Sequence, residues 1–223
     1  MKNILHNVVE SEPFGQGSFE EALRVGILKT EEQILQASSS EGWMSGTTAV
    51  VLLVVDLFLY CANVGDSECV VGNKTPFVTG FSPKCVTKIH RPTRENPEEV
   101  KRIQDLGGMV QQGRVFGSLS VSRALGDCEY KTPRSPHDFV TAEPYVVSMP
   151  LVDETYRVEF AICACDGVWD VVTYKGAVKL VGKHFRKKDS PFVSCDTLVK
   201  EALCRGSGDN ISCIIVFFRY TYS

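Results

Sequence analysis

Four aspartates in this 223-residue chain stand directly beside apolar runs, and they are Asp66, Asp166, Asp170 and Asp209. Strand ends at one edge of a sheet lie close together, so these carboxylates are expected to gather. Clustered carboxylates repel one another unless a hard divalent cation such as Mg²⁺ or Mn²⁺ neutralises them. The alternative is that each aspartate forms an Asx turn with a neighbouring glycine or asparagine. The spacing alone leaves both interpretations open.

The runs that must position these residues have the length and composition of β-strands. They cover residues 47–55, 57–64, 159–165 and 211–219. The very short link at Asp56 predicts that the first two runs form a hairpin. A second hairpin is predicted around Asn73-Lys74, between residues 68–72 and 75–79.

Helices are indicated by capping residues and by apolar residues at three- and four-residue intervals. The capping box Ser18-Phe-Glu-Glu21 predicts a helix up to the run of serines at 38–40. Asn96-Pro97 begins a second helix, and residues 178–185 and 192–203 have helical spacing. Because strands and helices do not alternate regularly, the pattern favours an α+β fold with antiparallel sheets over a doubly wound sheet.

Composition excludes several classes of protein. The chain has 24 Lys and Arg against 27 Asp and Glu, a formal charge of −3, so neither nucleic acid nor an anionic membrane is an expected partner. No apolar stretch reaches the roughly 18–20 residues needed to span a bilayer. Nine cysteines, an odd number, fit buried small apolar residues in a reducing compartment. We expect a cytoplasmic protein, with the nucleus as the other option.

Six sequence strings together resemble the metal-dependent type 2C Ser/Thr protein phosphatases. In chain order they are Ser45-Gly-Thr-Thr-Ala49, Ala62-Asn-Val-Gly-Asp-Ser67, Arg102-Ile103 with Gly107-Gly108, Gly113-Arg-Val115 with the run 117–127, Ala164-Cys-Asp-Gly-Val-Trp-Asp170 and Asp209-Asn-Ile-Ser212. Each string is weak evidence by itself, but their order makes the set specific. The resemblance covers the chain from about Phe19 to its end.

The resemblance implies an αββα sandwich of two antiparallel sheets flanked by helices, with a binuclear Mg²⁺ or Mn²⁺ site. A metal-bound water would attack the phosphorus of phosphoserine or phosphothreonine in a phosphoprotein substrate. The resemblance also implies that Asp166 and Asp209 are catalytic metal ligands, and that Asp66, Asp166 and Asp170 form a weaker metal site. Ser122 and Arg123 lie in a matching string, and we assign them to structure rather than to phosphate contact.

The chain also departs from the family pattern at its N-terminal end. The family's first strands, a phosphate-binding arginine and an Asp-Gly-His-Gly segment have no counterpart, so residues 1–17 are expected to be a remnant of the family's first helix and loop. We expect residues 1–223 to be one type 2C domain without those strands. Sheet edges and apolar faces left open in this way favour association, and we therefore predict a homodimer.

Three functions follow from the resemblance. The first is an atypical phosphatase with an incomplete site, which would make the chain an enzyme. The second is a pseudophosphatase, a catalytically weak or inactive scaffold that binds phosphoproteins or regulates partners. The third is a shortened version of an ordinary phosphatase. All three share one fold.

Overall fold

The computed structural model describes residues 3–76 and 79–220. The chain divides into two compact units, and we describe each by itself. Unit 1 comprises Met1–Leu52, Ala62–Asp66 and Lys88–Val147, and unit 2 comprises Leu53–Cys61, Ser67–Thr87 and Ser148–Ser223. Among the described residues, no helix is long and apolar enough to cross a membrane.

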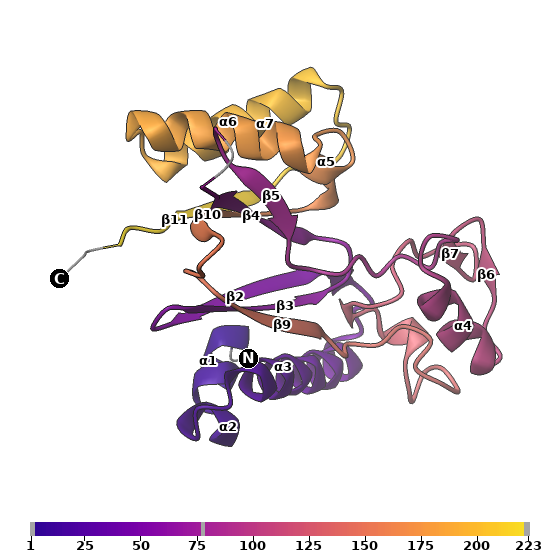
Figure 1. Cartoon of the computed structure of the whole chain (residues 1–223). Coiled ribbons are helices and arrows are strands. Elements are labelled where there is room, and N and C mark those ends of the chain that lie inside the picture. Colours follow the sequence, from indigo (N-terminus) through magenta and orange to yellow (C-terminus); the bar gives the residue numbers. More distant parts are fainter. Residues whose placement is uncertain (1–2, 77–78, 221–223) are drawn as a thin grey trace. The chain divides into compact units, whose positions relative to one another are not determined.

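The helices of unit 1 are α1 (Ile4–Val9), α2 (Glu12–Gly15), α3 (Phe19–Glu41), α4 (Pro97–Asp105) and the 3-10 turn η1 (Cys128–Tyr130). Helix α1 packs across α3, as Figure 1 shows. Gly26 of α3 leaves room for Val8 of α1, and Asn7 Nδ2 donates to Thr30 Oγ1 at 2.8 Å. Tertiary packing of a buried face, more than helix propensity, therefore holds these elements together.

Helix α3 begins where the sequence predicts, but the predicted capping box is wrong. The Ser18 side chain makes no capping hydrogen bond, and the Ser18 carbonyl instead accepts the Ala22 N–H at 2.9 Å. At the other end, Gly42 closes the helix in the left-handed conformation with φ 78°. The buried face of Leu23 and Ile27 fixes the helix without the reciprocal cap.

Short strand pairs complete unit 1, and they are β1 (Gly46–Thr47) with β8 (Leu125–Gly126), and β6 (Val110–Gln111) with β7 (Arg114–Val115). A separate three-stranded sheet, whose strands have residues in both units, has the order β2 (Ala49–Val55), β3 (Phe58–Val64) and β9 (Tyr145–Pro150). The predicted adjacency of β2 and β3 is confirmed, and Asp56 takes a left-handed conformation in the turn between them, with φ 51°.

Unit 2 has a four-stranded antiparallel sheet in the order β11-β10-β4-β5. Its strands are β4 (Glu68–Lys74), β5 (Ser82–Cys85), β10 (Arg157–Ala164) and β11 (Cys213–Phe217). Its helices are α5 (Asp166–Trp169), α6 (Tyr174–Lys187) and α7 (Pro191–Cys204), and α6 and α7 cover one face of the sheet (Figure 1). The core between the helices and the sheet contains Phe160, Ile162, Val178 and Leu198, all fully buried.

Two expectations about unit 2 are wrong. Asn73 and Lys74 do not form a turn, because β4 continues through Lys74 and pairs Asn73 with Ser82 of β5. The cysteines are not uniformly buried either, since Cys204 is exposed and five others are half-buried. Cys204 is the last residue of α7 and does not belong to the buried face of that helix.

Candidate functional site

Asp66 occupies a tight corner after β3 in unit 1. Gly65 precedes it with φ 94°, and a Cβ at that position would come within 2.3 Å of Thr48, so only glycine fits. The Asp66 carboxylate is nearly buried, and its Oδ2 accepts Arg91 Nε at 2.6 Å. The corner therefore holds a carboxylate in a fixed position beside a cation.

His90 holds the backbone of this corner. Its ring Nδ1 accepts the Gly65 N–H at 3.2 Å, and its own backbone N–H donates to the Gly65 carbonyl at 3.1 Å. Asn63 adds a second connection, because its Nδ2 donates to the Lys88 carbonyl and its Oδ1 accepts the Lys88 N–H. The segment 88–91 thus positions Asp66 through four hydrogen bonds and one ion pair.

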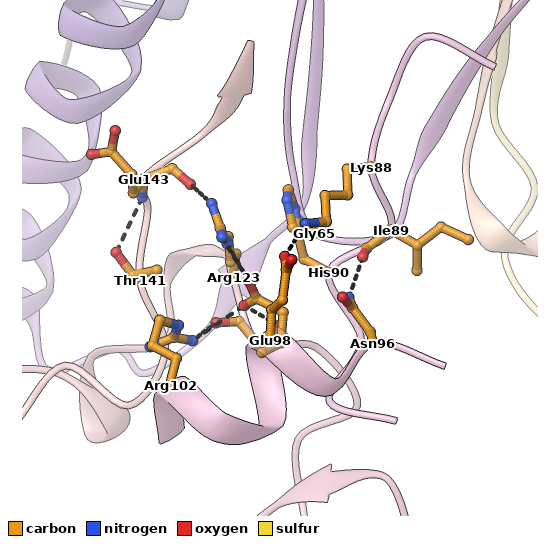
Figure 2. A network of polar contacts seen from close by, with 12 residues as sticks. Gly65, Lys88, Ile89, His90, Asn96, Glu98, Arg102, Arg123, Thr141 and Glu143 are labelled. Carbon is orange, nitrogen blue, oxygen red and sulfur yellow. Dashed lines mark hydrogen bonds and ion pairs between the residues drawn. The ribbon is translucent and has the colours of Figure 1, made fainter. Parts of the chain in front are cut away.

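Glu99 of α4 is the centre of a buried polar network in the same unit, part of which is seen in Figure 2. Arg123 donates to Glu99 Oε1 from both Nε (3.1 Å) and Nη2 (2.6 Å), and Ser122 Oγ donates to Oε2 at 2.7 Å. Arg102 approaches Oε2 at 3.4 Å and also donates to the carbonyls of Ser122 and Phe139. These contacts support the structural assignment of Ser122 and Arg123.

Electrostatics in this network favour a charged Glu99 and a neutral His90. Burial by itself raises the pKa of Glu99, but hydrogen bonds from Arg123 and Ser122 and the nearby guanidinium charges outweigh it and lower the pKa to about 2. Burial, followed by the charge of Arg123, lowers the pKa of His90 to about 4. At neutral pH the imidazole is therefore uncharged and can accept the Gly65 N–H.

Asp166 and Asp209 lie on two segments of unit 2 that are held against each other. Ser207 Oγ donates to the Gly167 carbonyl at 2.7 Å, and Cys165 Sγ contacts the Asn210 carbonyl at 3.2 Å. A Cβ on Gly167 would lie 2.4 Å from that same Asn210 oxygen, so the two backbones meet with no space for a side chain. The junction brings together the turns that carry the two predicted ligands.

Strand ends fix the rest of this junction. Cys165, the residue after β10, donates its N–H to the carbonyl of Ser212, just before β11. Trp169 Nε1 donates to the carbonyl of Ala164 at 3.0 Å and approaches that of Glu68 at 3.3 Å. The short helix α5, with Asp166 as its first residue and Asp170 just after its last, is thus anchored to the ends of β10 and β4.

The donor chemistry of the junction fits a hard cation. Carboxylates suit Mg²⁺ and Mn²⁺, and Mg²⁺ is commonly held through one or two carboxylates while water and phosphate oxygens complete its shell. Asp170 and Asp209 are exposed and Asp166 is half-buried. Within the described residues, no group of three or more His, Cys, Asp or Glu side chains is arranged to hold a metal ion. The assignment of four ligands, Asp66 among them, stays a prediction.

The family model described as Protein phosphatase 2C matches residues 1–211 of the chain. The chain belongs to the protein phosphatase 2C family. Its α+β fold with antiparallel sheets, predicted from the sequence, agrees with that of the family. A crystal structure of serine-threonine phosphatase 2C from Toxoplasma gondii superposes with a TM-score of 0.80 at 20% identity, over 97% of this chain and 78% of that one.

Curated relatives are more similar in sequence. Probable protein phosphatase 1N of Homo sapiens is 41% identical over 211 residues, which cover 93% of this chain and 46% of that protein. Protein spalten of Dictyostelium discoideum is 35% identical over 99% of this chain and 22% of its own length. The chain therefore spans less than half of the length of these two relatives.

Sequence reasoning missed the buried network around Glu99, and it assigned His90 to a structural role without finding its contact with Gly65. From the sequence alone, Glu99 is only an acidic residue in the first turn of a helix, yet it is 1% exposed and binds side chains that lie 23 and 24 positions further along the chain. The one signal available was the i, i+3 spacing of Glu99 and Arg102 on a helix. His90, beside Arg91, had no helical or strand period to reveal its contact with Gly65.

Proposed function

We propose that this chain acts as a metal-dependent protein serine/threonine phosphatase with an incomplete site. The observation that carries the proposal is the junction of the Asp166 and Asp209 segments, since the family resemblance assigns both residues as catalytic metal ligands. The chain's membership of the protein phosphatase 2C family supports the same activity. Phosphoserine and phosphothreonine in proteins are the proposed substrates, and Mg²⁺ or Mn²⁺ is the proposed cofactor.

A divalent cation bound here would supply an activated water and offset the charge of the phosphoryl oxygens. The protein's own part is to hold Asp166 and Asp209 in place. The contacts of Ser207, Cys165 and Gly167 join the backbone segments that carry these two residues. Asp170, one turn beyond Asp166, could accept a hydrogen bond from water in the same region. Asp66, fixed by Arg91, is proposed as a further ligand on the resemblance alone.

The proposal is tested on the chain as it stands. Hydrolysis of a small aryl phosphate and of a phosphothreonine peptide is measured with and without millimolar Mn²⁺, together with Mn²⁺ binding by calorimetry. Asp166→Asn and Asp209→Asn should each abolish the Mn²⁺-dependent rate and weaken Mn²⁺ binding. Asp196→Asn is the matched control, because Asp196 is a half-exposed residue of α7 whose one ion pair within the described residues is with Lys200. Equal rates in all four proteins would refute the proposal.

The alternative function is a pseudophosphatase scaffold. One observation favours it, namely that the described residues contain no group of three or more potential metal ligands. A scaffold would bind phosphoproteins or regulate partner enzymes without turnover. Mn²⁺ binding too weak to measure, combined with no hydrolysis but retained binding of a phosphothreonine peptide, would support this function over catalysis.

Three further expectations accompany the proposal. The first is one type 2C domain over residues 1–223, and the second is a cytoplasmic location. The third is a homodimer, supported by β11, an edge strand whose Ile214 is 68% exposed. Light scattering during size-exclusion chromatography should give the mass of a dimer, and a monomer at micromolar concentration would contradict it.

A further inference from the structure

A basic cavity lies in unit 2 at the end of the four-stranded sheet that is remote from Asp166. Its volume is about 1010 Å³, and it opens where β4 ends, where β10 begins and where the chain leaves β11. Within β10, Arg157 lies at this end, whereas Ala164 lies at the other end, beside α5. An eight-residue strand spans about 23 Å. The cavity is therefore separate from the Asp166 junction.

Positive charge predominates in the lining. Its charged residues are Lys74, Arg157, Glu159, Arg186 and Arg219. Glu159 is nearly buried and accepts Arg157 Nη2 at 2.6 Å, so those two charges offset each other. Lys74, Arg186 and Arg219 form no ion pair with any acidic side chain in the part of the chain that the structure describes. Three cations therefore line the cavity without a counter-charge from residues 3–76 and 79–220.

Aromatic rings hold the guanidinium groups of two lining residues, Arg157 and Arg186, in place. The Arg186 guanidinium lies over the ring of Phe81, 5.5 Å from its centroid, and that of Arg157 lies over Tyr220 at 5.3 Å. Such contacts limit the freedom of a long side chain, which lowers the entropic cost of binding an anion. The wall of the cavity thus combines aromatic rings with cationic groups that lie against them.

Thr75 adds a polar atom to the same wall. Its Oγ1 is shielded from solvent and has no hydrogen-bond partner among the described residues. A buried hydroxyl without a partner is uncommon in folded proteins. This oxygen can donate to a carboxylate or accept a backbone N–H of a molecule in the cavity, which makes it a second feature, besides charge, that points to a ligand.

We propose that this cavity is a docking site for an acidic peptide segment of a protein partner. The three unpaired cations come from the end of β4, the end of α6 and the residues after β11, so a ligand must present several separated negative charges to meet them all. The volume is at the upper end of the range of ligand pockets, roughly 300–1,000 Å³, and exceeds what a single phosphate fills. Leucine or phenylalanine between the acidic residues would pack on Phe81. The inference does not depend on the proposed phosphatase activity.

The test is fluorescence anisotropy with a short labelled peptide rich in glutamate and containing leucine and phenylalanine. A peptide with glutamine at every glutamate position is the ligand control. The protein variant is Arg186→Ala combined with Arg219→Ala. Its matched control is Lys175→Ala combined with Lys179→Ala, which removes the same charge from exposed positions of α6 outside the cavity. Circular dichroism verifies that both variants are folded.

The acidic peptide should bind the unmodified chain more tightly than the glutamine peptide. Binding should weaken about fivefold to tenfold in the arginine variant, as expected for the loss of two exposed ion pairs, and change less than about twofold in the lysine control. Lys74→Ala should also weaken it, which provides a test if the double variant does not fold. Equal affinity for the two peptides, or equal loss in both protein variants, would overturn the proposal. The proposal would also be overturned if inorganic phosphate displaced the peptide more effectively than chloride does at equal ionic strength.

Discussion

Replacing Glu99 with glutamine should destabilise the fold far more than replacing the neighbouring Glu98 with glutamine. The Glu99 side chain is 2% exposed, and its contacts with Arg123 and Ser122 lower its pKa from 4.5 to about 2. A pKa difference of this size corresponds to about 3 kcal/mol of stabilisation of the charged form. Glutamine keeps the shape but loses the charge, which leaves the guanidinium of Arg123 buried without a counter-ion.

The assay is urea unfolding followed by tryptophan fluorescence. With a typical urea dependence of about 1–3 kcal/mol/M, Glu99→Gln should lower the midpoint by about 1–3 M. The control is Glu98→Gln, because Glu98 is 75% exposed and its one ion pair with a described residue is that with Lys88, and exposed pairs contribute little to stability. A midpoint for Glu99→Gln within error of that for Glu98→Gln would refute the reasoning.

The same variant gives a pH signature. A carboxylate whose folded pKa is lowered contributes stability that is complete above its unfolded pKa and is lost as the pH falls toward its folded pKa. For Glu99 that window lies between pH 4.5 and about 2. The difference in unfolding free energy between the unmodified chain and Glu99→Gln should stay constant from pH 7 to about 5 and shrink below it. A constant difference down to pH 2.5 would contradict the assigned pKa.

Three other predictions test the remaining polar contacts. The pKa of His90 is lowered from 6.5 to about 4, so the unfolded chain binds the proton before the folded chain does as the pH falls. The free energy of unfolding should therefore decrease between pH 6.5 and about 4. Urea titrations at several pH values should show a weaker pH dependence for His90→Asn. Gly167→Ala should lower the free energy of unfolding by about 1–3 kcal/mol, because its Cβ would lie 2.4 Å from the Asn210 oxygen, and this should appear as a lower thermal midpoint. Gly208→Ala, whose Cβ would meet nothing within 4 Å, should leave the midpoint unchanged. Lys131→Met should cost about 3–5 kcal/mol because it leaves Glu31 buried without its cation at 2.5 Å, and adding Glu31→Gln should recover part of that loss in a double-mutant cycle.

Most elements of the fold could be predicted because their signals are local. Apolar alternation and turn residues gave β3, β10 and the helices α4, α6 and α7 to within a few residues. The failures occurred where a longer-range contact decides the local structure. Asn73 and Lys74 have turn-like composition, but pairing with β5 extends β4 through them. Ser18 has a capping sequence, but packing of α3 fixes the start of the helix instead.

In the candidate site, too, local features could be predicted from the sequence and long-range contacts could not. The aspartates were found because each stands next to a strand, and strand position can be inferred from sequence. The groups that hold them could not be found in this way: Gly65 and His90 are 25 positions apart, and Cys165 and Asn210 are 45 apart. Such contacts join segments far apart in the sequence, and no sequence period marks them.

Asp66 and Asp209 should respond differently to mutation, because their side chains differ in burial and in contacts. Asp66 is nearly buried and its carboxylate is bound by Arg91, so replacing it removes an ion pair and should lower stability whether or not a cation binds. Asp209 is exposed, and the one hydrogen bond that its carboxylate accepts from a described residue, the N–H of Asn210, lies within its own turn. Its replacement by asparagine should leave the unfolding midpoint unchanged, and any loss of Mn²⁺ binding or hydrolysis in that variant can then be attributed to the ligand itself. Loss of folding in Asp209→Asn would contradict this reasoning, because no described contact of the side chain reaches beyond its neighbour.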